Sequence, residues 1–586
     1  MARWKSQGTT KDQSGRILPS ATVSVYLAGT TTAASVYTSV TSATAVNSVT
    51  SNSTDATYVF YTDCFDYDYD QTFKIIITRS GYTSVTYDNI PHGEIVLGTY
   101  TISTVKTVTT YVKIPKGVLY VKSGSGALTF NGPFEAGIYP VFSGFTAGVI
   151  FGAGAVREVY PQWFGATGDG ATDDSVAFQS ALNSGAGNTV VVPKGDYKIT
   201  TTLTVTVTDA TKPTNIGGVG KGSRLKWYGG NDTSFLNWKG SAGAGWYALT
   251  IIERLYLINS NAATGLIGIQ IGDSAVGVTA GLGNTLITLN RIENMDVAIK
   301  NIWESDEMTI SENHFYAYNS YGVHLVSGII KVINNHFQGG AATSWGIYSQ
   351  GVVPTITGNT IQGEDINGVE LRGSCFDLSN NYLESGPVAY SSTYAVKLTG
   401  AKAGKISGNL FTGFPGAYII HADATTKNIQ ILSNYFGQSG GYAKALIAVV
   451  AGATGIEVLG PQLTDDGTVF TEGEITGVVS INIADTETIV PRVRTLNSSA
   501  NMEGPVTQTM FAVTASSCHI VFITQGDEFY QATGIITVGE GSSTAELFKV
   551  SSTHANLQLA VSGLNVQAYQ GEAVARTVKW RTLRIY

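Results

Sequence analysis

The chain has 586 residues with a formal net charge of -8; 13% of its residues are charged and 68 are glycine. An acidic chain without a basic stripe is not expected to bind nucleic acid. The sequence has no run of about 18 apolar residues that would insert into a membrane. Its three cysteines, too few and too far apart for a disulfide framework or a zinc site, are expected to be reduced and buried: Cys64, Cys375 and Cys518. We expect no cofactor and no bound metal.

Residues 1–100 are predicted to form a small β-domain. Three segments alternate apolar and polar residues, and turns rich in Gly, Ser and Asp separate them: residues 21–27, 57–61 and 72–78. Residues 15–26, together with 72–75 and 80–84, resemble the immunoglobulin-like modules found at the front of tail fibres and in carboxypeptidase regulatory domains. This resemblance implies attachment rather than catalysis.

Residues 101–160 are predicted to be a connecting β segment with the first coils of a larger repeat. The sequence Glu158-Val-Tyr-Pro-Gln-Trp-Phe-Gly-Ala-Thr-Gly-Asp-Gly, its continuation to Leu182, and residues 190–197 follow. This stretch resembles the start of the pectate-lyase-like β-helix of phage tailspikes and polysaccharide depolymerases.

From residue 290 to 434 an asparagine recurs every 22 to 28 residues, and an apolar residue follows each one two positions later. The seven are Asn290, Asn313, Asn335, Asn359, Asn381, Asn409 and Asn434. A period in the low twenties with strand-forming residues indicates a stacked repeat, and the leucine-dense frame of a leucine-rich repeat is missing. We therefore predict a right-handed parallel β-helix with three strands per coil over residues 161–464. The asparagines would form one corner, where they tolerate a left-handed backbone and can bond from coil to coil.

Two groups of residues invite a metal-site interpretation, which we do not favour. Asp169, Asp173 and Asp174 could be metal ligands or catalytic carboxylates. We expect instead that Asp173 or Asp174 caps a short helix whose apolar face plugs the end of the β-helix; that face comprises Phe178, Ala181 and Leu182. His314 and His336 each follow a corner asparagine, and a stacked repeat places equal residues at equal positions without any metal.

A second motif recurs in step with the asparagines: a small residue, a β-branched residue, a variable residue and usually an apolar one. Because side chains alternate along a strand, the third residue points outward. These outward positions are Gln270, Lys300, His324, Tyr348, Glu370 and Lys397. We call them the stripe. Coils about 4.8 Å apart would make it a groove for a linear polymer.

Glu370 lies in the middle of the stripe, with Glu364 and Asp365 in the preceding loop and Arg372 on the same outward face. Glycoside hydrolysis needs an acid and a second carboxylate about 5 to 9.5 Å apart. Glu370 with Asp365 or Glu364 is therefore the predicted catalytic pair. The alternative acidic group is Glu304, Asp306 and Glu307.

The stripe also permits β-elimination, with Tyr348, His324 or Lys397 as the base and Arg372 neutralising a uronic carboxylate. We favour hydrolysis because acidic pairs are present and the sequence shows no dense calcium-binding cluster. The predicted substrate-binding residues are Lys300, His324, Tyr348, Arg372, Lys397, Trp345 and Trp303. The two indoles either stack on sugar rings or fill structural positions.

Residues 465–586 are predicted to form a terminal β-sandwich. The regular repeat fades there, and alternating segments follow, joined by Gly/Ser turns: residues 480–483, 519–524 and 557–561. Such a domain could form a trimer, bind sugar, or do both. The predicted fold is thus all-β, a parallel β-helix flanked by two β-sandwich domains.

The resemblance to phage tailspikes covers about residues 110–460. It implies a homotrimer in the virion tail, bound to tail or baseplate proteins through its N-terminal domain. At the bacterial surface it would bind and depolymerise O-antigen, capsule or exopolysaccharide. The alternatives are a polysaccharide lyase and a receptor-binding spike that does not cleave. The first residues contain no apolar region and hence no secretory signal, which disfavours a secreted bacterial pectin lyase.

Overall fold

The computed structural model describes residues 2–585 apart from 242–248, 273–281, 303–306, 341–343, 352, 364–365, 386–393, 415–418, 438–446, 451, 460–462, 465–474, 477–498, 503–505, 513–517, 526–529, 539–544, 553–556, 563–564 and 571–575. From residue 458 onward it describes strands but no side chains. Nearly all regular structure in this described part is β, and no helix in it is long and apolar enough to cross a membrane. The chain forms two compact units, Met1–Met295 with Ile302–Met308 and Asp296–Asn301 with Thr309–Tyr586.

The first unit begins with two antiparallel sheets. The strand order of one sheet is β4 (Thr57–Asp63), β1 (Arg3–Thr9) and β7 (Glu94–Ile95). The order of the other is β3 (Ser48–Thr50), β2 (Thr22–Leu27), β5 (Thr72–Thr78) and β6 (Val85–Pro91). The three segments predicted as strands form β2, β4 and β5. Their alternating apolar residues make a buried core that includes Val23, Val25, Phe60, Phe73 and Ile75.

Short parallel coils come next in the same unit. Three small parallel sheets contain β8 (Gly98–Ile102), β11 (Val118–Lys122) and β14 (Phe142–Ser143); β9 (Val105–Val108), β12 (Ala127–Phe130) and β15 (Val149–Phe151); and β10 (Val112–Ile114) with β13 (Phe134–Ala136). Aromatic rings fill the interior, with Phe130 and Phe134 centred 4.7 Å apart.

One α-helix, α1 (Ser175–Ser184), follows the 3-10 turn η1 (Pro161–Phe164). Phe178, Ala181 and Leu182 are buried, as predicted for the plug face. Asp174 is the N-cap residue, but its carboxylate accepts from Thr167 and Gly168, while Asp173 accepts from the backbone N–H of Ser175 at 3.0 Å. Asp173 thus caps the first turn. Asp169 accepts from backbone N–H groups of its own turn, which lower its pKa to about 2.

The rest of the chain up to residue 476 is a parallel β-helix of about twelve coils with three sheets per coil, which confirms the predicted architecture. In the first unit, its strands are β16 (Glu158–Val159), β18 (Thr189–Val192), β21 (Asn215–Gly218), β24 (Thr250–Glu253) and β27 (Thr285–Thr288) in the first sheet; β17 (Asp169–Asp173), β19 (Gly195–Ile199), β22 (Ser223–Trp227), β25 (Tyr256–Asn259) and β28 (Arg291–Glu293) in the second; and β20 (Leu203–Val207), β23 (Ser234–Gly240) and β26 (Ile267–Ile271) in the third. The 3-10 turn η2 spans Gly220–Gly222.

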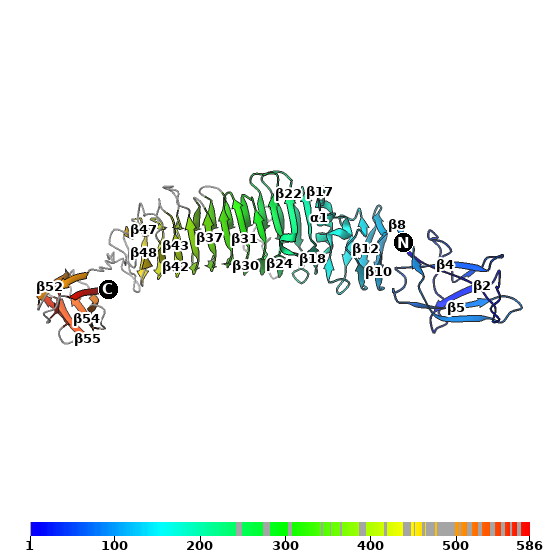
Figure 1. The fold of residues 1–586 in the computed structure, drawn as a ribbon, viewed down its shortest axis with the longest axis horizontal. Helices are drawn as coiled ribbons and strands as arrows, with labels where there is room; N and C mark the ends of the chain where they lie inside the picture. The colour runs from blue at the N-terminus through cyan, green and yellow to red at the C-terminus, as the bar shows by residue number, and fades with distance from the viewer. Residues whose placement is uncertain are drawn as a thin grey trace. The chain divides into compact units, whose positions relative to one another are not determined.

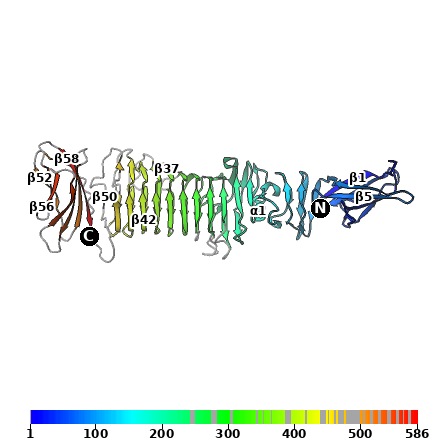
Figure 2. The same cartoon turned by 90° about the horizontal axis from the view of Figure 1, so that it is seen from below.

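In the second unit the first sheet contains β30 (Met308–Ser311), β33 (Ile329–Ile333), β36 (Val353–Thr357), β39 (Asp377–Ser379), β42 (Lys402–Ser407), β45 (Lys427–Leu432) and β48 (Thr454–Leu459). The second sheet contains β31 (His314–Tyr318), β34 (His336–Gly339), β37 (Thr360–Gly363), β40 (Tyr382–Ser385), β43 (Leu410–Thr412), β46 (Tyr435–Gly437) and β49 (Leu463–Thr464). The third sheet contains β29 (Val297–Asn301), β32 (Tyr321–Leu325), β35 (Trp345–Ser349), β38 (Asn367–Leu371), β41 (Val396–Leu398), β44 (Ile420–Ala422), β47 (Ile447–Val449) and β50 (Ile475–Thr476). Figures 1 and 2 show them stacked side by side in chain order. Inward residues such as Val323, Ile347 and Val369 are fully buried.

The asparagines form a buried ladder at one corner. From Asn313 to Asn434, each side-chain amide donates to Oδ1 of the next asparagine at 2.9 to 3.0 Å. The prediction that they carry the left-handed backbone is wrong. Among the described residues, that conformation belongs to the residue before each asparagine, with φ of 55° at Asn334, 69° at Gly358 and 56° at Asn380. The turn is made one residue earlier, so that the asparagine side chain points inward.

After residue 498 the strands are antiparallel. They form a sheet of β51 (Ser499–Met502), β58 (Arg576–Ile585), β53 (Cys518–Gln525), β54 (Tyr530–Val538) and β55 (Ala545–Ser552), and a sheet of β52 (Val506–Ala512), β57 (Asn565–Gln570) and β56 (Leu557–Ser562). Of the cysteines, Cys64 is buried, but Cys375 is exposed because it lies in a turn with φ of 60°. The side chain of Cys518 lies outside the described part of the chain.

Candidate functional site

The third sheet of the second unit aligns the stripe in a continuous row. Lys300 pairs in register with His324, His324 with Tyr348, Tyr348 with Glu370, and Glu370 with Lys397. The row continues beyond the predicted residues to His421 in β44. Gln270 lies in β26 of the first unit. The predicted alternation therefore brings five of the six residues together on neighbouring strands.

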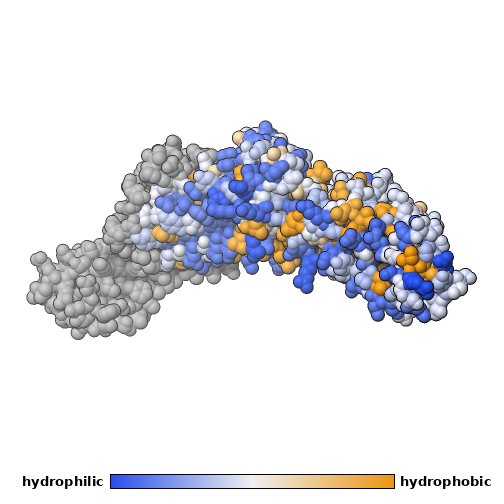
Figure 3. Space-filling model, turned by 45° about the vertical axis from the view of Figure 1, so that its right-hand side comes forward, coloured by the Kyte–Doolittle hydropathy of each residue, from blue (hydrophilic) through white to orange (hydrophobic). Residues whose placement is uncertain are grey.

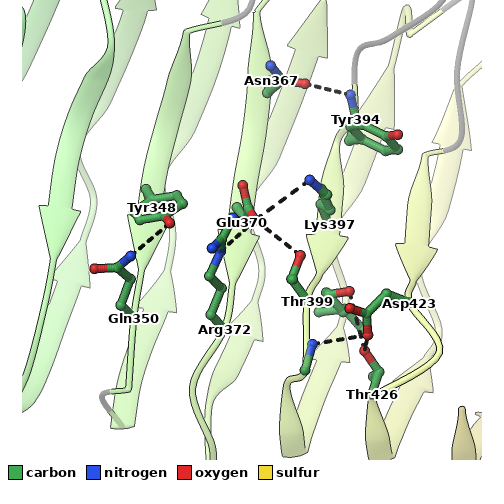
Figure 4. Close-up of polar contacts among 12 residues, drawn as sticks. Tyr348, Gln350, Asn367, Glu370, Arg372, Tyr394, Lys397, Thr399, Asp423 and Thr426 are labelled. Carbon is green, nitrogen blue, oxygen red and sulfur yellow. Dashed lines mark hydrogen bonds and ion pairs between the residues drawn. The ribbon is translucent and has the colours of Figure 1, made fainter.

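Glu370 is held by several donors. Its Oε1 accepts from Arg372 Nε at 2.8 Å and Nη2 at 2.7 Å and from Thr399 Oγ1 at 3.1 Å, with Lys397 Nζ at 3.7 Å (Figure 4). Only 3% of Glu370 is exposed, although its position on the strand points outward, because these neighbours cover it. Burial opposes the charged guanidinium, yet the hydrogen bond and the charge of Glu370 raise the pKa of Arg372. An oxygen surrounded by donors suits a base or a nucleophile better than an acid.

Aromatic rings flank this group on one side. The rings of Trp345 and Tyr394 stack with their centres 6.4 Å apart and an angle of 9° between their planes. Lys397 Nζ lies 5.9 Å from the centre of the Trp345 ring and 5.6 Å from that of Tyr394. The ring of His421 packs beside that of Tyr394, with 5.3 Å between the ring centres. Burial, reinforced by the charge of Lys397, lowers the pKa of His421. Ring faces beside a cation are a suitable surface for sugar rings.

A second aromatic group lies on the other side of Glu370. The Tyr321 ring is 4.9 Å from both His324 and Tyr348, and His324 meets Tyr348 edge-on at 5.0 Å. The Arg372 guanidinium lies 5.0 Å from the Tyr348 ring. Burial and the charge of Lys300 lower the pKa of His324 to about 4, so its imidazole is neutral at pH 7.

The structure describes seven of the ten predicted site residues. Glu370, Lys300, His324, Tyr348, Arg372, Lys397 and Trp345 all belong to the third sheet or directly follow its strands. Glu364, Asp365 and Trp303 lie outside the described residues, as do Glu304 and Asp306 of the alternative acidic group. Whether they approach Glu370 therefore stays a prediction.

Sequence reasoning missed Gln350, Thr399, Tyr394, Tyr321 and His421. Gln350 could have been found, because it follows Tyr348 by two residues and so shares its face, as Arg372 does with Glu370. Tyr394 lies just before β41 and Thr399 just after it, so their approach depends on the path of the chain between coils.

The predicted site is not at the cavity of about 680 Å³ that the first unit contains. That cavity is lined by Trp4, Tyr69 and Tyr139 among others and by the ion pair of Lys113 and Glu135 at 3.3 Å. His314 and His336 stack at 4.5 Å. In the described part of the chain, no group of three or more His, Cys, Asp or Glu side chains could hold a metal ion.

Two family models match parts of the chain. Residues 157–234 match rhamnogalacturonase A/epimerase, pectate lyase-like, and residues 258–445 match the periplasmic copper-binding protein NosD. The predicted resemblance to pectate-lyase-like β-helices is thus confirmed, at the segment that motivated it. No curated protein sequence matches the chain at a significant level.

Three solved structures are similar to this chain at low sequence identity and low TM-score. DFA-IIIase from Arthrobacter chlorophenolicus A6, without its lid, is 13% identical, with a TM-score of 0.42, 56% of this chain and 100% of that chain covered. ORF18 of Geobacillus virus E2 is 14% identical, with a TM-score of 0.39 and coverages of 70% and 78%. The tailspike gp49 of Acinetobacter baumannii bacteriophage Fri1, a capsular polysaccharide depolymerase, is 11% identical, with a TM-score of 0.29 and coverages of 73% and 86%.

Proposed function

We propose that this chain is a phage tailspike that binds and depolymerises a bacterial surface polysaccharide. The observation that supports this best is the register-aligned row from Lys300 to Lys397, with a clamped carboxylate at Glu370 and aromatic rings on both sides. Strands about 4.8 Å apart present one functional side chain per step along a linear polymer.

The proposed reaction is hydrolysis. Glu370 acts as the base or nucleophile, and Asp365 or Glu364 completes the carboxylate pair. Cleavage by β-elimination is the second candidate, favoured by the neutral imidazole of His324 beside Tyr348. That pair could remove a proton next to a uronic carboxylate.

The proposed assembly is a homotrimer in the virion tail. Residues 1–100 would attach to tail or baseplate proteins, residues 101–160 would connect them to the β-helix of residues 161–464, and residues 465–586 would trimerise or bind sugar. Exposed apolar residues that are neighbours in the first sheet, Ile329 and Val353, support burial against other copies of the chain.

The experiment incubates the full chain with purified surface polysaccharide of its host. New reducing ends without ultraviolet absorbance from an unsaturated product mean hydrolysis, the absorbance means elimination, and neither outcome means a binder that does not cleave. Glu370→Gln should lower the rate about 100-fold or more with binding intact. Glu457→Gln, in the first sheet, is the matched control and should be active. Full activity in both Glu370→Gln and Asp365→Asn would contradict the proposed site.

A further inference from the structure

Tyr348 and Gln350 form a hydrogen-bonded pair on the outer face of the third sheet. Gln350 Nε2 donates to the phenolic oxygen of Tyr348 at 2.8 Å, and Figure 4 shows both side chains on the side of the sheet that carries Glu370 and Arg372. Only 7% of Tyr348 is exposed, and the rings of Tyr321 and His324 pack against it. The ring is therefore held in one place.

The direction of the phenolic proton follows from counting donors and acceptors. Because an amide N–H of Gln350 already occupies the acceptor side of the Tyr348 oxygen, the O–H must be donated elsewhere. The amide is oriented from its other end, where Gln350 Oε1 lies 3.5 Å from His324 Nε2. A neutral imidazole that carries its proton on Nε2 donates to this oxygen and keeps the amide nitrogen on Tyr348.

We propose that Tyr348 donates a proton to the departing sugar oxygen and that Gln350 is the positioning residue that turns this proton toward the polymer, an inference that rests on the proposed function. In hydrolysis the glycosidic C–O bond breaks and its electron pair goes to the leaving oxygen, which takes the proton from Tyr348 in place of the acid that Asp365 or Glu364 would supply in a carboxylate pair. Water adds its oxygen to the anomeric carbon and gives a proton to Glu370, which returns it to the phenolate. Elimination needs the same donation to the leaving oxygen.

The test measures kcat and KM of the full chain against pH. Tyr348→Phe should lower kcat about 100-fold or more with KM changed only a fewfold. An ionised carboxylate only accepts hydrogen bonds. In Gln350→Glu the phenolic O–H of Tyr348 therefore donates to the introduced carboxylate and no longer points toward the polymer. The kcat of this variant should fall about tenfold or more at neutral pH. Relative to the parent chain, it should recover as the pH falls toward about 4, where the introduced carboxyl is protonated and donates again.

A structural role for Gln350 predicts that the melting temperature recovers together with kcat at low pH, whereas the positioning role predicts recovery of kcat at an unchanged melting temperature. The recovery should vanish in the Tyr348→Phe, Gln350→Glu double variant, and Gln338→Glu in β34 of the second sheet should leave the pH profile unchanged. Full activity of Tyr348→Phe beside an inactive Glu370→Gln would overturn this inference and leave the proposed function intact. An unchanged pH profile in Gln350→Glu would overturn the positioning role. Activity in Glu370→Gln and Tyr348→Phe alike would contradict both proposals.

Discussion

Asn335 and Asn359, one coil apart, are joined by two hydrogen bonds to a single oxygen. Oδ1 of Asn359 accepts from the backbone N–H of Asn335 at 2.9 Å and from its side-chain amide at 3.0 Å. The amide of Asn359 in turn donates to Asn381 at 2.9 Å. Both asparagines are buried, and their amides also donate to backbone carbonyls of their own and the preceding coil, so each corner satisfies its polar groups through neighbouring coils.

Replacing Asn359 by Leu should therefore destabilise the β-helix by about 1 to 3 kcal/mol, because buried donors and acceptors on two coils lose their partners. The matched control is Asn334→Gly, at a left-handed position where glycine is at ease. It should unfold at nearly the parent denaturant concentration. Equal unfolding midpoints for Asn359→Leu and the parent chain would mean that the ladder adds no stability.

Arg372→Met removes the guanidinium that holds Glu370. The buried carboxylate then keeps Thr399 and the more distant Lys397, so we expect a loss of about 1 to 3 kcal/mol, less than for a fully buried pair because 40% of the Arg372 side chain is exposed. Activity should fall as well. Adding Glu370→Gln should restore much of the stability without restoring activity, which a double-mutant cycle measures. If the stability losses of Arg372→Met and Glu370→Gln were additive, Arg372 would not stabilise the Glu370 carboxylate.

The pH dependence of stability should report on His324. Its folded pKa of about 4 lies below its unfolded value of 6.5, so the folded state binds fewer protons. The contribution of His324 to stability is thus complete above pH 6.5 and is lost as the pH falls through 4. In His324→Gln the loss of unfolding free energy between these pH values should be smaller by about 1 to 2 kcal/mol, after allowing for a partly exposed ring, and the melting temperature should fall less steeply with pH. Parallel curves would refute the buried neutral imidazole.

Trimerisation should depend on the outer face of the first sheet. Ile329 and Val353 are neighbours in register and are 49% and 41% exposed. On the face in Figure 3, hydrophobic residues interrupt a largely hydrophilic surface. We expect light scattering at micromolar concentration to give three times the monomer mass, and Ile329→Lys with Val353→Lys to give less. Val219→Lys, at a residue that is 58% exposed in the first unit, is the control. A monomeric parent chain would contradict the prediction.

Much of the fold could be predicted from the sequence, because a β-helix repeats local rules. A period in the low twenties sets the coil, and alternation along each strand sends Val369 inward and Glu370 outward. The same alternation predicts that Lys300, His324, Tyr348, Glu370 and Lys397 form one row, as the register confirms. The apolar face of α1 was equally visible, since Phe178, Ala181 and Leu182 share one side of the helix.

Only the tertiary structure decided what surrounds that row. Thr399 is one of the donors to Glu370, and Tyr394 is one of the aromatic residues beside it. The backbone N–H of Tyr394 donates to the side chain of Asn367, which is 27 residues earlier in the chain. Such approaches depend on how the chain travels between coils, for which no sequence period exists. The ladder shows the same limit at close range: the spacing located Asn335, but only the backbone showed that Asn334 before it makes the left-handed turn. Period and alternation act along the chain, whereas burial and hydrogen-bond partners arise between coils.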